Sequence, residues 1–120
     1  MASFALVLFD IDGTLLRRSG PHHRQALEEA IRRVTGLHAT TEGIATQGML
    51  DRDIITIMMQ RAGATRAHIR ASMVGVMAAA ETVYDETCPD LRSRVCVGAE
   101  VLLASAAGCR RIELYTRCWA

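Results

Sequence analysis

Residues 5–16 read ALVLFDIDGTLL, and this stretch decides the expected fold. Residues 4–9 are all apolar, and the run is too short for a helical pattern. Such a run is typical of a strand buried on both faces, as in a parallel sheet covered by helices. Asp10 and Asp12 follow at once, and Gly13 then predicts a loop. Both carboxylates are therefore expected beyond the carboxyl end of a strand, where open parallel sheets bind ligands.

Two carboxylates held in one place repel each other unless a cation or a shared proton compensates them. Mg²⁺ is the natural cation, because it takes oxygen ligands and commonly bridges to a phosphate group. One carboxylate can then act as a nucleophile and the other as a general acid and base. Thr14 can cap the following segment or donate a hydrogen bond to a phosphate oxygen. The simpler alternative is an Asp-Gly turn that carries two solvated acids.

Residues 7–16, VLFDIDGTLL, closely resemble the first signature of the haloacid dehalogenase superfamily, a hydrophobic strand followed by Asp-x-Asp-Gly-Thr-Leu. The resemblance implies an aspartyl-phosphate mechanism, in which Asp10 attacks phosphorus and Asp12 serves as the general acid and base. It also implies that Mg²⁺ is held by the Asp10 carboxylate and the Asp12 backbone carbonyl. Gly13 and Thr14 are the expected phosphate-binding residues of this loop. The Asp-x-Asp form resembles the phosphatase and phosphomutase branches of the superfamily.

Helical periodicity dominates the middle of the chain. Helices are predicted, with their capping and stop residues, over 19–36, 49–63, 65–87 and 99–107. The first three resemble the helical cap of phosphoglycolate-phosphatase-like members, and VCVGAEVLL (residues 95–103) resembles the return to the core. Within this segment Gln47, Gly48 and Arg52 are candidates to face the substrate, although ordinary helix-surface roles are the simpler reading. The expected organisation is a partial α/β core over 1–16 and 90–120 with a cap over 17–89.

The remaining signatures of the superfamily are incomplete in this chain. Residues 111–116 are a candidate second strand, and Thr116 is the candidate for the Ser or Thr of the second signature, a further phosphate-binding residue. All fourteen basic residues are arginine, so the expected lysine is absent. No acidic cluster follows Thr116 to complete a magnesium shell. The fold expected is therefore an α/β, Rossmann-like haloacid dehalogenase core that is incomplete, with an inserted helical cap.

The function is predicted from the same resemblance to the haloacid dehalogenase superfamily. The sequence predicts a Mg²⁺-dependent phosphatase of small phosphorylated metabolites, impaired in this short chain. The alternatives are an inactive fragment and a phosphomutase of the same superfamily. A truncation, a change of reading frame near residues 104–108 and a natural short protein all account for the missing signatures.

Composition limits the partners and the location. The formal net charge is +1, and arginines alternate with acids, which is not the clustered basic surface of a nucleic-acid-binding protein. No apolar segment is long enough to span a membrane, and no signal peptide is recognisable, so a cytoplasmic location is expected. The four cysteines show no metal-binding spacing and are expected to be reduced. Self-association is expected through the exposed edge of the strand at residues 4–9.

Overall fold

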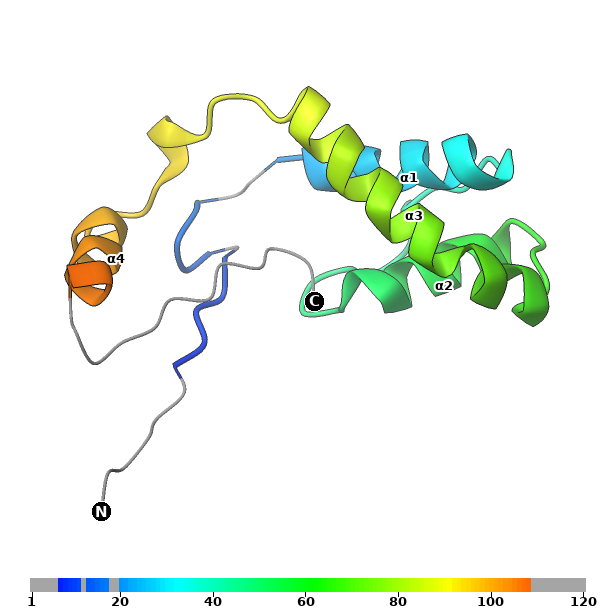
Figure 1. Cartoon of the computed structure of the whole chain (residues 1–120), viewed down its shortest axis with the longest axis horizontal. Helices are drawn as coiled ribbons and strands as arrows, with labels where there is room; N and C mark the ends of the chain where they lie inside the picture. Colours follow the sequence, from blue (N-terminus) through cyan, green and yellow to red (C-terminus); the bar gives the residue numbers. More distant parts are fainter. Residues whose placement is uncertain (1–6, 12, 18–19, 109–120) are drawn as a thin grey trace, which may run out of the picture. The chain divides into compact units, whose positions relative to one another are not determined.

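The computed structural model describes residues 7–11, 13–17 and 20–108, and these fall into two compact units (Figure 1). Residues 21–88 form the first, which we call the helical unit. The other, which we call the loop unit, comprises residues 7–11, 13–17, 20 and 89–108. The chain passes from one unit to the other between Gly20 and Pro21 and again between Cys88 and Pro89. That these units correspond to a cap and a partial core stays a prediction.

The helical unit begins with α1 (His22–Thr35). Pro21 precedes it in a helical conformation, which suits a residue whose ring fixes φ and which has no N–H to satisfy. The helix ends at Gly36, where φ is 73° and the backbone N–H donates to the carbonyl of Arg32. A glycine adopts this left-handed conformation without steric cost. The helix therefore ends at the glycine that the sequence predicted as its end.

Two further helices complete this unit. The first, α2 (Asp51–Arg61), carries Asp51 and Asp53 in its first turn, where negative charge is favoured. The second, α3 (Arg66–Thr87), is capped by the hydroxyl of Thr65, which accepts a hydrogen bond from the His68 N–H at 3.2 Å. Helix α3 contacts both α1 and α2, and its contact with α1 is the most extensive in the unit.

One continuous hydrophobic core lies between these three helices. Its buried side chains are Leu27, Ala30 and Ile31 of α1, Ile54, Ile55, Met58 and Met59 of α2, and Ile69, Met73, Val76 and Ala80 of α3. They recur at three- and four-residue spacing, so each helix buries one stripe, as the periodicity predicted. Val34 and Leu50 continue the helical spacing but are 42% and 63% exposed.

The connection between α1 and α2 is fixed by side chains rather than by regular structure. Glu28 of α1 accepts hydrogen bonds through Oε1 from the Thr41 N–H at 2.8 Å and the Thr41 hydroxyl at 3.0 Å. Directly after Thr41, the carbonyls of Glu42 and Gly43 accept hydrogen bonds from the Arg61 guanidinium of α2. These contacts satisfy backbone groups that would otherwise have no partner, and they hold residues 40–43 against α1 and α2.

The loop unit contains little regular structure in its described part. Residues 92–94 form a single 3₁₀ turn, Arg92–Arg94, and the last described element of the unit is α4 (Ala99–Gly108). Leu16 and Val95 form an isolated antiparallel bridge. Of the residues of α4, only Ala99 is buried, whereas Val101 and Leu102 are exposed. The described part of this unit therefore has far fewer buried apolar side chains than the helical unit.

The α/β core predicted from the sequence is wrong for the described part of the chain, which is helical and contains no strand or sheet. Residues 7–9 of the expected first strand are not in a strand, and Val7 and Leu8 are 67% and 82% exposed. An apolar run satisfies its backbone as a strand only when neighbouring strands pair with it, and none of the described segments does so. The second expected strand, residues 111–116, lies outside the described residues.

Across the residues described, no helix combines the length and the apolar character needed to cross a membrane.

Candidate functional site

Asp10 lies in an irregular segment immediately before a tight turn, and its side chain is exposed. It is the residue that the sequence assigns as the nucleophile, and an exposed carboxylate is accessible to a ligand. Its expected partner Asp12 lies outside the described residues, as does Thr116. The structure therefore places one of the two predicted catalytic aspartates and does not bear on their separation.

The turn that follows Asp10 is closed by its own backbone. The Ile11 carbonyl accepts hydrogen bonds from the N–H groups of Thr14, Leu15 and Leu16 at 3.3, 3.0 and 2.9 Å. The Gly13 N–H donates to the Leu16 carbonyl at 2.8 Å, and Gly13 has a φ of 82° that favours glycine. The amides of Gly13, Thr14, Leu15 and Leu16 therefore all donate within the turn.

This backbone pattern restricts how the turn could hold a phosphate group. A phosphate cradle of backbone amides needs N–H groups that are not committed elsewhere, and those of Gly13 and Thr14 are committed. The Thr14 side chain is exposed, and its hydroxyl has no partner within the described part of the chain. Of the groups of Gly13 and Thr14 that can donate a hydrogen bond, this hydroxyl alone remains available.

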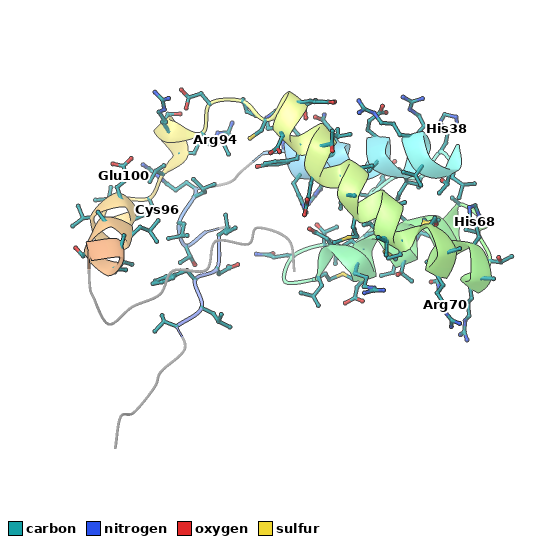
Figure 2. The ribbon with its side chains drawn as sticks, viewed as in Figure 1. His38, His68, Arg70, Arg94, Cys96 and Glu100 are labelled. Carbon is teal, nitrogen blue, oxygen red and sulfur yellow. The ribbon has the colours of Figure 1, made fainter. Side chains whose placement is uncertain are left out.

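The return segment after the helical unit holds the turn in place. Leu16 pairs with Val95, the Arg17 N–H donates to the Arg94 carbonyl at 2.7 Å, and the Cys96 N–H donates to the Leu15 carbonyl at 2.8 Å. Figure 2 labels Arg94 and Cys96 on this segment. Two parts of the chain that are about eighty residues apart in sequence are therefore joined by an antiparallel contact. Sequence reasoning missed this pairing, because one bridge leaves no periodic signal.

A surface hollow lies on the same return segment. It has a volume of about 230 Å³ and is lined by Arg92, residues 95–98, Glu100 and Val101. Cys96 belongs both to the hollow and to the contact with Leu15. The hollow and the turn are thus neighbours through one residue of the loop unit.

The described residues do not by themselves assemble a magnesium site. No group of three histidine, cysteine, aspartate or glutamate side chains that could hold a metal ion occurs among them. Mg²⁺ commonly uses only one or two protein carboxylates and takes its other ligands from water and substrate phosphate. An exposed Asp10 fits that chemistry as one ligand, and the second predicted ligand, Asp12, is not described.

The predicted substrate-facing residues lie in the helical unit. Gln47 and Gly48 are exposed in the connection before α2, and Arg52 is exposed on the first turn of that helix. They are therefore accessible to solvent, and their approach to the Asp10 turn stays a prediction.

The helical unit contains polar pairs that the sequence did not reveal. His23 Nε2 lies 2.8 Å from Asp51 Oδ1 and joins the first turns of α1 and α2. Glu29 pairs with both Arg32 and Arg33, and Arg33 also reaches Glu86 on α3 at 3.1 Å. The hydrogen bonds from Arg32 and then Arg33 lower the pKa of Glu29 to about 2. Only the contact of Glu29 with its two arginines follows from helical spacing.

Comparison with known proteins gives no relative for this chain: no family model, no curated protein and no solved structure matches it.

Proposed function

We propose that this chain is a Mg²⁺-dependent phosphatase of small phosphorylated metabolites, with Asp10 as its nucleophile. The observation that carries the proposal is the motif FDIDGTL at residues 9–15, together with the exposure of the Asp10 carboxylate just before a closed turn. A turn held by four internal backbone hydrogen bonds fixes the direction in which the chain leaves Asp10. Fixed positions matter here, because phosphoryl transfer depends mainly on positioning and on neutralised charge.

The proposed reaction has two steps that balance in protons. The Asp10 carboxylate attacks phosphorus, the bond to the ester oxygen breaks, and the leaving oxygen takes a proton from Asp12. Asp12 then removes a proton from water, which attacks the aspartyl phosphate and releases inorganic phosphate while Asp10 is regenerated. Mg²⁺, when bound, supplies positive charge to the phosphate oxygens. The Thr14 hydroxyl donates a hydrogen bond to one of those oxygens.

Arginine provides the remaining positive charge in this proposal. The chain has no lysine, whereas the exposed Arg17 lies at the end of the turn and its backbone is held by the Arg94 carbonyl. An arginine gives the same charge as a lysine and can donate two parallel hydrogen bonds to a phosphate group. Arg17 is therefore the residue of this turn proposed to attract the phosphorylated substrate.

The test is hydrolysis of p-nitrophenyl phosphate by the purified full chain, with Mg²⁺ and with EDTA. Asp10→Asn should abolish the Mg²⁺-dependent rate, and Arg17→Gln should raise KM more than it lowers kcat. The control is Asp85→Asn, which removes an exposed carboxylate of α3 and should leave the rate unchanged. Circular dichroism of each variant verifies that the helices are intact. Equal rates for the parent chain and Asp10→Asn, from folded samples, would contradict the proposal.

A second measurement separates binding from turnover. Beryllium fluoride mimics a phosphoryl group on aspartate, so ¹⁹F NMR should show a Mg²⁺-dependent bound signal that Asp10→Asn removes. A bound signal without hydrolysis indicates a chain that binds phosphate but does not turn over, which is the inactive alternative. Release of phosphate to water distinguishes a phosphatase from a phosphomutase. A cytoplasmic location stays a prediction from the sequence.

A further inference from the structure

A polar pocket in the helical unit lies outside the proposed phosphatase site. It has a volume of about 380 Å³ and is formed by α1 and the start of the following connection. Its walls are Gln25, Glu28, Glu29, Arg32, His38 and Ala39. Figure 2 labels His38 next to the C-terminal end of α1.

The charged groups of this pocket are not all neutralised. Glu29 is bound by Arg32, with N–O distances of 2.8 and 2.6 Å, and also by Arg33, so its charge is compensated. Glu28 differs, because only the neutral hydroxyls of Thr40 and Thr41 and the Thr41 N–H donate to it. No arginine or histidine pairs with Glu28 within the described residues. The pocket therefore keeps one uncompensated negative charge.

The Glu28 carboxylate is also held in position. Three hydrogen bonds converge on Oε1, at 2.8, 3.0 and 3.3 Å, and they leave Oε2 without a protein partner in the described part of the chain. The side chains of Gln25 and His38, which line the same pocket, likewise make no hydrogen bond to other described residues. A carboxylate oxygen, an amide oxygen and an imidazole nitrogen can each accept a hydrogen bond.

We propose that this pocket binds a small primary amine in its ammonium form. An ammonium group has three donors and one positive charge, and this pocket offers it acceptors on Glu28, Gln25 and His38 and a carboxylate that has no ion-pair partner among the described residues. A metal ion is the less suitable cation, because no metal-binding group of three side chains is found in the described segments. The chain contains no lysine, so neither it nor a second copy brings a side-chain ammonium to the pocket.

The proposal is tested by titrating the ¹⁵N-labelled full chain with n-butylammonium and following its amide signals by NMR. The signals of Thr41, His38 and the Gln25 side-chain amide should shift together and saturate. Tetramethylammonium has the same charge but no N–H donor, and n-butanol has the same chain but no charge. Both should bind at least tenfold more weakly, since a hydrogen bond to a charged group contributes about 1.5–3 kcal/mol.

Substitutions then locate the binding. Glu28→Gln removes the charge but keeps an acceptor for Thr41, and it should weaken n-butylammonium binding about tenfold or more. His38→Ala removes one exposed acceptor and should weaken binding by a smaller factor. Glu81→Gln, an exposed carboxylate on α3, is the matched control and should have no effect. His38 is exposed and lies outside the core, so His38→Ala should fold. It therefore still tests the proposal if Glu28→Gln does not fold.

Several results would overturn the proposal. One is a set of NMR shifts that are scattered over the surface and do not saturate. Another is binding of tetramethylammonium as tight as that of n-butylammonium. A third is an unchanged dissociation constant for n-butylammonium in His38→Ala or in a folded Glu28→Gln. Nα-acetyl-lysine amide gives a further comparison. If it binds much more tightly than n-butylammonium, the pocket prefers a lysine side chain of another protein to a small amine, and this contradicts the proposal. None of these outcomes depends on the phosphatase activity.

Discussion

The helical unit and the loop unit differ in what holds them together. Eleven buried side chains from three helices form one core in the helical unit. The described part of the loop unit is joined instead by one β-bridge and a few backbone hydrogen bonds, and α4 buries only Ala99. Apolar burial is the main favourable contribution to folding, and isolated backbone hydrogen bonds contribute little net free energy. Among the residues that the structure describes, the stabilising apolar burial is therefore concentrated in the helical unit.

Truncating one leucine in each unit is the strongest test of this difference. Leu27→Ala removes a fully buried side chain of the core and should lower the free energy of unfolding by about 2–5 kcal/mol. Leu102→Ala makes the same chemical change on α4, where the side chain is 48% exposed, and should cost less than about 1 kcal/mol. Urea unfolding followed by circular dichroism measures both. Equal losses would show that the loop unit shares the core's stability.

Two glycines of the helical unit should respond in opposite directions to alanine. Gly36→Ala places a side chain at a φ of 73° and should destabilise the unit by about 1 kcal/mol. Gly75→Ala lies within α3, where the new Cβ would meet Val34 Cγ1 at 3.4 Å, which is ordinary contact. It should stabilise the unit by up to about 1 kcal/mol, since alanine favours a helix more than glycine. Thermal melting of the two variants checks this, and a loss in both would contradict the observed packing of α3 against α1.

The contact between His23 and Asp51 should add a smaller contribution. These side chains join α1 to α2 and are 30% and 18% exposed. A double-mutant cycle with His23→Ala and Asp51→Ala should give a coupling free energy of about 0.2–1 kcal/mol, as for other accessible ion pairs. A coupling of zero would mean that the helices dock without this pair.

The smallest expected effect concerns the acid stability of the helical unit. Hydrogen bonds from Arg32 first and Arg33 second hold the pKa of Glu29 at about 2, below its usual 4.5. A pKa lowered by folding stabilises the folded state above pH 4.5, and this contribution disappears as the pH falls towards 2. Urea midpoints of the parent chain and Glu29→Gln should therefore differ near neutral pH and converge in acid. A difference between the two urea midpoints that does not change with pH would show that the ion pairs of Glu29 are not its cause.

The sequence predicted the helices well and the sheet wrongly. Leu27, Ile31 and Gly36 define α1 by local spacing and by a stop signal, and such information lies within a few residues. A strand depends on partners that are distant in the sequence, so the apolar residues 7–9 could not specify one alone. The expected helix of 99–107 is confirmed as α4.

The candidate site could be recognised by its motif but not by its geometry. The sequence identified Asp10 and the turn at Gly13, which has the positive φ that a glycine allows. It did not reveal the hydrogen bonds of that turn, the contact of Leu15 with Cys96, or the pairing of Glu28 with Thr41. The contact of Leu15 with Cys96 and the pairing of Glu28 with Thr41 depend on which separate segments of the chain meet. The spacing of residues in the sequence does not reveal a contact between distant segments unless that contact belongs to a regular, repeating pattern.

Native-state hydrogen exchange of the full chain tests the central claim most directly. Amides near the centres of α1, α2 and α3 should exchange slowly, with opening free energies that approach the global free energy of unfolding. Those of Leu16, Arg17 and Cys96 and of α4 should exchange at opening free energies well below that value, although they are hydrogen-bonded. Equal protection of the described amides in the two units would contradict the conclusion that stability is concentrated in the helical unit.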